Sequence, residues 1–375
     1  MSLSIRQVEH LITGLWYKKS PLNFMFCVLL SPLSALYWVI SFCLRTLKVR
    51  IRSPSLILTE LNLPVIVVGN ISVGGTGKTP IIINLAKHLI EAGYQPAIIS
   101  RGYGGIASRK KNAVTTVYAD SDPIYCGEEP VLIAQLLESV PVIISASRSS
   151  AYLYVANTLN CNVVLSDDGL QHYQLPRTIE IAVIDSKRGL GNGLLLPSGP
   201  LRERASRLKQ VDHIILNGSE QSDFSQQFTQ LSTKTTKVVT SIEALREIEY
   251  SGHTLSYSSI DKIRERLFDF SALHMVAGIG NPEKFFTTVS DIFLTSKTMP
   301  HLVRHAYSDH YRYSVEDAQA LDALAGADAL IVTAKDAVKL LALGYSFQAN
   351  FFIIDIETVL DTDITKAIIN SLNQK

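Results

Sequence analysis

The sequence predicts an α/β fold: a doubly wound, mainly parallel sheet, a second and smaller α/β domain, and an apolar helix at the N-terminus. Three observations lead to this prediction. Short apolar runs alternate with helical patterns between Pro64 and Gly218, as in parallel sheets covered by helices on both faces. A shorter alternation of the same kind begins at His274. Residues 20–44 contain no charged side chain.

The first alternation defines the elements expected in the main sheet. We expect strands at residues 65–68, 96–99, 140–144, 163–165, 179–184 and 213–216. We expect helices at residues 80–92 and 130–138. Polar clusters follow four of these strands, at residues 70–79, 100–105, 167–172 and 185–193. Because functional residues of such sheets lie beyond the carboxyl ends of the strands, these clusters form the candidate site.

The uncharged stretch at residues 20–44 is long enough to cross a bilayer as a helix. Pro32 lies in its middle, so a kink or a re-entrant, interfacial hairpin is an alternative to a spanning helix. A third interpretation is a core helix of a soluble domain. Basic residues flank the stretch, and the larger group follows it, at Lys18, Lys19, Arg45, Lys48, Arg50 and Arg52. This asymmetry favours membrane attachment with the remaining chain in the cytoplasm.

A glycine-rich loop follows the first expected strand and leads into a helix. It reads SVGGTGKT and comprises Ser72, Val73, Gly74, Gly75, Thr76, Gly77, Lys78 and Thr79. The pattern matches G-x-x-x-x-G-K-[ST] except at Ser72, where glycine is usual. Backbone N–H groups of such a P-loop hold phosphates at the helix N-terminus. We therefore predict a nucleoside triphosphate site in which Lys78 reaches the β- and γ-phosphates and the Thr79 hydroxyl holds Mg²⁺.

Two adjacent acids, Asp167 and Asp168, follow the expected strand at residues 163–165. A P-loop enzyme needs a carboxylate at the end of a neighbouring strand to hold Mg²⁺. Either acid could bind the metal, directly or through water. The alternative is that the two acids begin a turn or cap a helix.

Phosphoryl transfer also needs a group that positions or deprotonates the acceptor, and cations for the developing charge. Glu128 and Glu129 are candidate bases, although acids at a helix N-terminus also complement the helix dipole. His310, with Asp309 beside it, could accept a proton near neutral pH, or could be a surface histidine. Arg148 and Arg202 are candidate phosphate ligands, because the guanidinium group matches the geometry of phosphate. The alternative is that each is a solvated surface charge.

Composition and length set the remaining bounds. The chain has 375 residues, with Lys+Arg 35 against Asp+Glu 34, which argues against a nucleic-acid partner. Four cysteines form no C-x-x-C pair, so neither a disulfide framework nor a zinc site is indicated. We expect an N-terminal membrane-associated segment at residues 1–52, a P-loop domain at 53–228, a linker or β-ribbon at 229–266, and a C-terminal α/β domain at 267–375.

Seven motifs occur in the order found in the lipid A disaccharide 4′-kinase (tetraacyldisaccharide 4′-kinase) family, which the chain resembles. They are VGNISVGGTGKTP, SRGYGG, GEEPVLIA, SDDGLQHYQL, RGLGNGLLLPSGPLRE, GIGNPEKFF and TAKDAVKL. The resemblance extends from PLSALY near the N-terminus to about Lys339. It implies a bacterial enzyme at the cytoplasmic face of the inner membrane. This enzyme would transfer the ATP γ-phosphate to the 4′-hydroxyl of a tetraacylated glucosamine disaccharide 1-phosphate, a membrane lipid, with Mg²⁺; no obligate protein partner is inferred.

The resemblance also assigns roles to residues. Lys78 and Thr79 belong to the P-loop, and Asp167 and Asp168 to the metal site. Glu128 falls at the position of the family's base, with His310 as its partner. Arg148, His172 and Arg202 would line the phosphates and the lipid headgroup.

Two positions depart from the family pattern. Aspartate is usual where this chain has Glu128, so the carboxylate reaches one methylene further and Glu129 could share the role of base. Glutamate is usual at Ala334. The main rival function is a membrane-bound P-loop ATPase switch, but such proteins carry a lysine at the position of Val73. A non-catalytic nucleotide-binding scaffold is disfavoured by the complete set of loop and metal-site residues.

Overall fold

An eight-stranded sheet forms the centre of the larger α/β unit, in a computed structural model that describes residues 14–17, 20–51, 61–110, 113–218, 235–238, 240–249, 253–294, 296 and 298–374. Its strand order is β3-β4-β2-β5-β1-β6-β7-β8, and every neighbouring pair is parallel except β3 and β4. The strands are β1 (Val65–Gly69), β2 (Pro96–Ser100), β3 (Thr115–Val117), β4 (Val142–Ile144), β5 (Val163–Asp167), β6 (Ile179–Asp185), β7 (His213–Asn217) and β8 (Thr235–Val238). The predicted fold class is confirmed, and each of the six expected strands is present.

Helices cover both faces of this sheet because its strands are apolar on both sides. On β1, Ile66 and Val68 contribute to one buried cluster with α4 (Lys78–Glu91) and α6 (Glu128–Leu136), while Val65 and Val67 contribute to another with α7 (Arg148–Thr158). The shorter helices of this unit are η1 (Ala107–Arg109), α5 (Pro123–Cys126) and η2 (Ala205–Gln210). Because β1, β2, β5, β6 and β7 run parallel, their carboxyl ends meet at one edge of the sheet.

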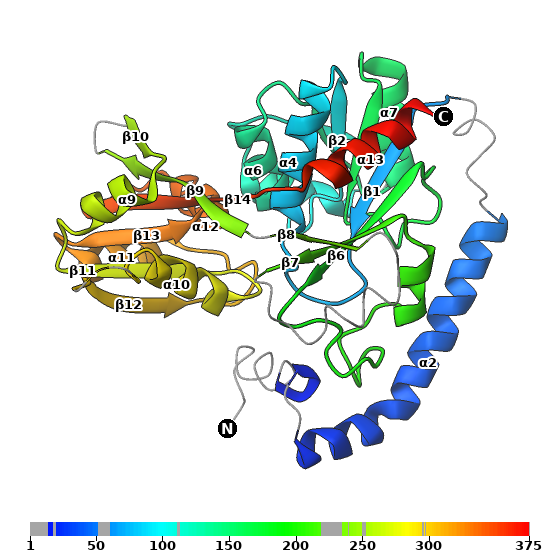
Figure 1. Ribbon diagram of the computed structural model, residues 1–375, viewed down its shortest axis with the longest axis horizontal. Coiled ribbons are helices and arrows are strands. Elements are labelled where there is room, and N and C mark those ends of the chain that lie inside the picture. Colours follow the sequence, from blue (N-terminus) through cyan, green and yellow to red (C-terminus); the bar gives the residue numbers. More distant parts are fainter. Residues whose placement is uncertain are drawn as a thin grey trace.

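A six-stranded sheet forms the second unit, with strand order β10-β9-β14-β13-β11-β12. Its strands are β9 (Thr240–Ile248), β10 (Thr254–Tyr257), β11 (Ala272–Ala277), β12 (His301–Ala306), β13 (Ala329–Thr333) and β14 (Asn350–Thr358). Helices α9 (Ile260–Leu267) and α10 (Pro282–Asp291) cover one face, and α11 (Val315–Ala325) and α12 (Ala334–Leu341) cover the other. Figure 1 shows the two sheets side by side, with β14 leading from one to the other.

The C-terminal helix α13 (Thr362–Asn373) returns to the first unit (Figure 1). Ile364, Ile368 and Leu372 are buried in the same cluster as α4 and α6. The Tyr94 hydroxyl also donates a hydrogen bond of 2.6 Å to Asn373. The predicted unit of residues 267–375 is therefore wrong for its last segment, because apolar side chains of α13 complete the core of the P-loop unit. Periodicity alone carried no information about which core they would join.

The predicted linker at residues 229–266 is divided between the two sheets where the structure describes it. Strand β8 pairs with β7 in the first sheet. Strand β9 pairs with both β14 and β10 in the second sheet, antiparallel to each. The predicted boundary at 228/229 lies outside the described residues.

Helix α2 (Pro21–Ile51) runs along the outside of the first unit as one continuous helix (Figure 1). It passes through Pro32 without forming a hairpin. Proline leaves the carbonyl four residues earlier without its helical donor, and the Ser31 hydroxyl donates to that carbonyl, Val28 O, at 2.7 Å. Residues Asn23–Thr46 have a mean hydropathy of 2.0, and only 6% of the most apolar window is buried. The interpretation as a core helix is therefore wrong.

Candidate functional site

The P-loop crosses the end of β1 and opens helix α4. Gly77, immediately before the helix, has φ 79°, and Gly74 has φ 105°, a left-handed region that favours glycine. A Cβ at Gly77 would lie 2.0 Å from the Asn217 side-chain nitrogen. Among the described residues, no side chain caps the N-terminus of α4. Its first N–H groups are thus available for an anion, as a phosphate site requires.

The start of the P-loop is held by the backbone of residues 200–202. The Val73 N–H donates to the Pro200 carbonyl at 2.8 Å, and Ser72 forms an isolated bridge with Leu201. Ser72, Thr76 and Thr79 are all buried. A small residue fits at Ser72 because the backbone at residues 200–202 passes directly beside it. The departure from glycine at this position therefore leaves the loop intact.

Lys78 and Arg202 both contact Asp168. The Lys78 Nζ lies 3.5 Å from Asp168 Oδ1, and Arg202 donates to Asp168 Oδ2 at 3.1 Å. Burial alone would raise the pKa of Asp168, but the charges of Lys78 and Arg202 lower it to about 2. The structure thus brings together three residues that the sequence analysis selected separately.

Asp167 is more deeply buried than Asp168 and has fewer cations around it. It accepts a hydrogen bond of 3.1 Å from Ser100, at the end of β2. Burial and the negative charges of Glu129 and Asp168 raise the pKa of Asp167 to about 6, against the opposing effect of Lys78. Burial thus favours the protonated form of Asp167 over the carboxylate.

Arg148 lies beneath these acids and is only 3% exposed. It donates to the backbone carbonyl of Asp167 at 2.8 Å and to that of Ser145 at 3.3 Å. Burial lowers the pKa of Arg148 to about 10. Arg148 is thus no solvated surface charge; it supports the end of β5, and its role as a phosphate ligand stays a prediction.

The residues predicted to hold Mg²⁺ fit a cation that retains phosphate and water ligands. Within the described ranges, no three His, Cys, Asp or Glu side chains group into a metal site. Mg²⁺ at a nucleotide is commonly held by one or two protein groups plus phosphates and waters. Asp168 Oδ1 is buried and has no hydrogen-bond partner among the described residues. That oxygen, the Asp167 carboxylate and the buried Thr79 hydroxyl form a donor set that suits Mg²⁺.

Glu128 and His310 meet where the two units face each other. Glu128 is the first residue of α6, and His310 lies in the loop between β12 and α11. His310 Nδ1 is 2.8 Å from Glu128 Oε1. Burial lowers the pKa of His310, but the hydrogen bond and charges of Glu128, together with Asp309 and Glu129, raise it overall. The Asp309 carboxylate is 3.9 Å from His310 Nε2.

Backbone conformation marks two of these positions. Asp168 has φ 47° and His310 has φ 56°, the left-handed region that non-glycine residues rarely occupy. Such conformations concentrate at functional sites, where the surrounding contacts hold them. The Tyr103 ring, from the SRGYGG motif, lies 5.0 Å from the His310 ring, and the Tyr103 carbonyl lies 2.8 Å from where a Cβ on Gly127 would be. The SRGYGG loop thus supports both members of the Glu128–His310 pair.

Helix α12 supplies two lysines to the acids of α6. Lys335 forms an ion pair with Glu129. Lys339 Nζ lies 3.6 Å from Glu128 Oε2 and 2.9 Å from Asp336 Oδ1. Sequence reasoning missed both lysines, although the TAKDAVKL motif contains them at a spacing of four residues, which places them on one helix face.

The second unit also touches the P-loop. A Cβ on Gly280 would lie 2.9 Å from the Gly75 nitrogen, and Arg188 donates to the Gly280 carbonyl at 3.1 Å. Lys284, on α10, lies 3.4 Å from the Asn217 side-chain oxygen, and Asn217 donates to the Thr76 carbonyl at 3.0 Å. Gly280 and Lys284 both belong to the GIGNPEKFF motif. The sequence gave no indication that this motif lies near the P-loop, because the two are far apart along the chain.

His172 is half-buried in the turn that follows Asp168. The backbone N–H of His172 donates to the Gly169 carbonyl at 2.9 Å. A role at the lipid headgroup stays a prediction for this residue.

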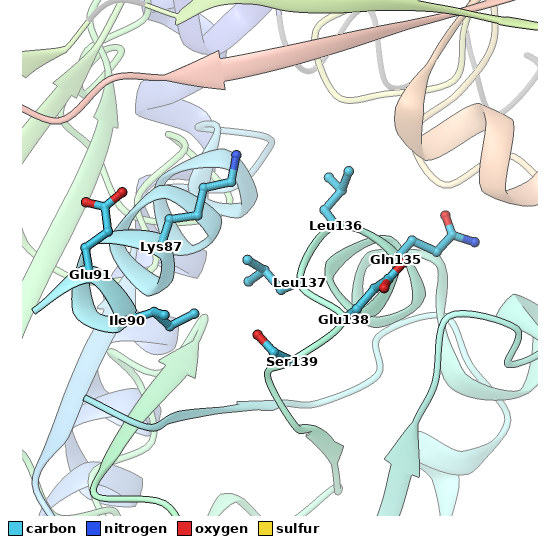
Figure 2. A pocket seen from close by; sticks show the side chains of 8 residues that line it. All are labelled: Lys87, Ile90, Glu91, Gln135, Leu136, Leu137, Glu138 and Ser139. Carbon is cyan, nitrogen blue, oxygen red and sulfur yellow. The ribbon is translucent and has the colours of Figure 1, made fainter. Parts of the chain in front are cut away.

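A pocket of about 600 Å³ lies away from all of these residues, between the C-terminal ends of α4 and α6 (Figure 2). Lys87, Ile90 and Glu91 line one side, and residues 135–139 line the other. Because the P-loop is at the opposite end of α4, this pocket is separate from the candidate site.

Comparison with known proteins gives consistent matches across most of the chain. The family model described as tetraacyldisaccharide-1-P 4'-kinase matches residues 26–373. A tetraacyldisaccharide 4'-kinase of Shewanella denitrificans is 38% identical over 367 residues, 97% of this chain and 98% of the relative. The corresponding protein of Hahella chejuensis is 36% identical over 330 residues, covering 88% and 87%. A crystal structure of LpxK from Aquifex aeolicus in complex with ATP has a TM-score of 0.67 at 24% identity, covering 92% of this chain and 99% of that one.

Proposed function

Because the chain belongs to the tetraacyldisaccharide-1-P 4'-kinase family, we propose that it transfers the γ-phosphate of ATP to the 4′-hydroxyl of a tetraacylated glucosamine disaccharide 1-phosphate. This reaction belongs to lipid A biosynthesis. The observation that carries the proposal is the 2.8 Å contact between Glu128 and His310. It supplies an acceptor-side base where the two units meet, which a simple nucleotide switch does not need.

The nucleotide is held by the P-loop and the residues around Asp168. When ATP binds, the Lys78 ammonium either exchanges its contact with Asp168 for the β- and γ-phosphates or contacts both. The N–H groups at the start of α4 bind phosphate oxygens. Arg202 contacts Asp168, which places the guanidinium close to these phosphates. These contacts stabilise the charge that develops on the transferred phosphoryl group.

Mg²⁺ would be held by Thr79, Asp167 and Asp168. When bound, it would neutralise phosphate charge. Asp167 keeps its proton more readily than an ordinary aspartate, because burial and neighbouring acids raise its pKa to about 6. A cation bound beside Asp167 would lower this pKa, because positive charge stabilises the ionised carboxylate.

Glu128 accepts the proton of the 4′-hydroxyl, and His310 holds the carboxylate through Nδ1. Burial raises the pKa of Glu128, but His310, Lys339 and Lys335 lower it below its ordinary value. Glu128 is thus ionised at neutral pH and ready to act as a base. Glu129 is engaged by Lys335, which favours Glu128 over Glu129 for this role. His172, Arg148 and Arg202 complete the set proposed around the phosphates and headgroup.

The acceptor is an amphiphile, so the enzyme works at a membrane surface. Helix α2 exposes a continuous apolar set that includes Phe24, Leu29 and Leu36. Arg45, near its end, adds positive charge that attracts anionic lipids. We place the protein at the cytoplasmic face of a bacterial inner membrane, with the P-loop unit of residues 53–228 and the second unit, from residue 267 to the end of β14, forming the site between them.

The test is a transfer assay with the full chain in mixed micelles, γ-labelled ATP and a tetraacyl disaccharide 1-phosphate. We expect labelled lipid whose formation requires Mg²⁺ and the acceptor. A matched acceptor with its 4′-hydroxyl blocked should give none. Hydrolysis of ATP at the same rate with and without acceptor, and no labelled lipid, would instead support the membrane-bound ATPase switch.

A further inference from the structure

Lys339 is a nearly buried cation that faces the Glu128 carboxylate from the second unit. Its side chain is 9% exposed, equal to that of Glu128, and Asp336 between them is fully buried. The ammonium is 3.6 Å from Glu128 Oε2 and 2.9 Å from Asp336 Oδ1, at ion-pair distance without the alignment of a hydrogen bond to either. A buried charge of this kind is costly unless it is compensated by nearby groups.

Asp336 does not need the lysine to be satisfied. It accepts hydrogen bonds from the Gly278 N–H at 2.9 Å, the Tyr313 hydroxyl at 3.1 Å and the Thr333 hydroxyl at 2.6 Å. These donors fix Asp336 at the start of α12. Asp336 therefore serves as a rigid anchor for the Lys339 ammonium, which leaves the lysine charge directed at Glu128.

The two oxygens of Glu128 are held by different residues of the second unit. His310 contacts Oε1, and Lys339 contacts Oε2. A glutamate side chain has three rotatable bonds, so a single contact at one oxygen leaves the other free to swing. Contacts at both oxygens restrict rotation of the carboxylate more than one contact would, and proton transfer from a bound hydroxyl requires such positioning.

We propose that Lys339 is a positioning residue for phosphoryl transfer: anchored by Asp336, it holds the Glu128 carboxylate in line with the acceptor hydroxyl. The inference rests on the proposed function, because it takes Glu128 to be the group that accepts the proton. Lys339 touches neither ATP nor the acceptor in this arrangement. It acts only through Glu128, and this distinguishes it from Lys78.

The charged groups around Glu128 are few and come from three segments. Lys335 and Lys339 lie on α12, His310 and Asp309 on the loop before α11, and Glu129 beside Glu128 on α6. Lys335 is paired with Glu129, which leaves Lys339 and His310 as the cations in contact with Glu128. Loss of the Lys339 charge therefore leaves the carboxylate with one fewer stabilising contact and shifts its protonation to higher pH.

The experiment compares Lys339→Met with Lys339→Arg in the full chain, using the lipid transfer assay across about pH 5 to about pH 9. Methionine keeps the packing of the aliphatic stem, and arginine keeps the charge. We expect Lys339→Met to lower kcat roughly 10- to 100-fold, to move the acidic limb of the kcat profile to higher pH, and to leave the KM for ATP unchanged. Lys339→Arg should recover most of the activity and the wild-type limb.

Lys262→Met is the matched control, because Lys262 is exposed on α9, which covers the face of the second sheet opposite to α12. Wild-type kinetics are expected for it. A Lys339→Met protein with the kcat and pH limb of this control would overturn the proposal, as would an Arg variant as impaired as the Met variant.

A double-mutant cycle keeps the test decisive if Lys339→Met lowers activity by weakening the fold. In a Glu128→Gln background, Lys339→Met should cause no further loss of kcat, since the base is already absent. An additive loss would contradict action through Glu128. Failure of the proposed function is separately visible, because the wild-type chain would then form no labelled lipid at any pH.

Discussion

The nucleotide side and the acceptor side of the site are built in different ways. On the nucleotide side, Lys78, Asp168 and Arg202 all come from one sheet and its adjoining loops, and they contact one another directly. On the acceptor side, Glu128 belongs to the P-loop unit, while His310 and Lys339 belong to the second unit. The charged groups of the nucleotide side belong to one unit, which the second unit touches at Gly75 and Asn217. Those of the acceptor side come from both units.

This difference has an energetic consequence. Strand ends in a single packed sheet are fixed by the core itself, so the P-loop and Asp168 are placed before any ligand arrives. The acceptor side depends on a small number of ion pairs and hydrogen bonds between units. A mutation on one side should therefore have a different kinetic signature from a mutation on the other.

The largest effect is expected on the nucleotide side, from Lys78→Ala. The substitution removes the positive charge directed at the β- and γ-phosphates and should lower kcat by about 10³-fold or more. ATP binding should weaken as well, because the lysine contacts the bound phosphates. Steady-state transfer kinetics and equilibrium binding of a fluorescent ATP analogue measure the two effects.

Lys262→Ala provides the control for this substitution, since it removes an exposed lysine of α9 in the second unit. It should leave both measurements unchanged. Near-normal turnover in Lys78→Ala would remove the P-loop from the mechanism and place phosphate stabilisation elsewhere.

The next effect is on the acceptor side, from Glu128→Gln. Glutamine keeps the shape and an acceptor for His310 but cannot take up a proton, so kcat should fall about 10²- to 10³-fold. Binding of ATP should be unaffected, because Glu128 does not contact the phosphates in the proposed mechanism. The contrast with Lys78→Ala is the sharpest test that the two sides are separable.

Glu129→Gln shows which of the two acids is the base. A larger loss of kcat in this variant than in Glu128→Gln would transfer the role to Glu129. An unchanged kcat in Glu128→Gln would refute its role outright.

The same contrast explains how much the sequence could reveal. The P-loop unit was predicted strand by strand, because buried parallel strands are continuous apolar runs and polar residues gather at their ends. Asp167, Asp168 and Lys78 were found together for that reason. Strand β3 (Thr115–Val117) escaped prediction because three residues, two of them threonine, carry no apolar run.

The acceptor side could be predicted only in part. Glu128 and His310 were selected as candidate residues, but no period or spacing relates positions separated by 182 residues. Lys339 and Lys335 were not selected, since charges on an amphipathic helix are normally solvated. Their role depends on how α12 meets α6, which is a property of tertiary packing. The position of α13 was mispredicted for the same reason.

A smaller effect is expected from His310→Ala, and it depends on pH. Because the pKa of His310 is raised above 6.5 in the folded protein, the histidine contributes stability that is fully present below its unfolded pKa of about 6.5. That contribution is lost as pH rises through the raised pKa. The wild type should therefore exceed His310→Ala in unfolding free energy at about pH 6, and the difference should shrink at about pH 9.

Urea unfolding at the two pH values measures this difference, with His253→Ala, at the residue immediately before the edge strand β10, as a control. A difference that grows with pH would show that His310 is not held as a cation by Glu128. The acceptor side would then lack the coupling between units that distinguishes it from the nucleotide side.

The smallest effect concerns the nucleotide side and its link to α2. The Tyr37 hydroxyl donates to the Arg202 carbonyl at 3.1 Å, and the Arg202 N–H donates to the Ile71 carbonyl at 2.7 Å, directly before the P-loop. Tyr37→Phe removes one partly buried hydrogen bond, which is worth about 1 kcal/mol or roughly fivefold in an equilibrium constant. We expect ATP affinity to weaken by no more than this, with no shift of the acidic limb of kcat. A shifted limb would mean that α2 reaches the acceptor side as well, and the two sides would then be coupled through α2 rather than assembled independently.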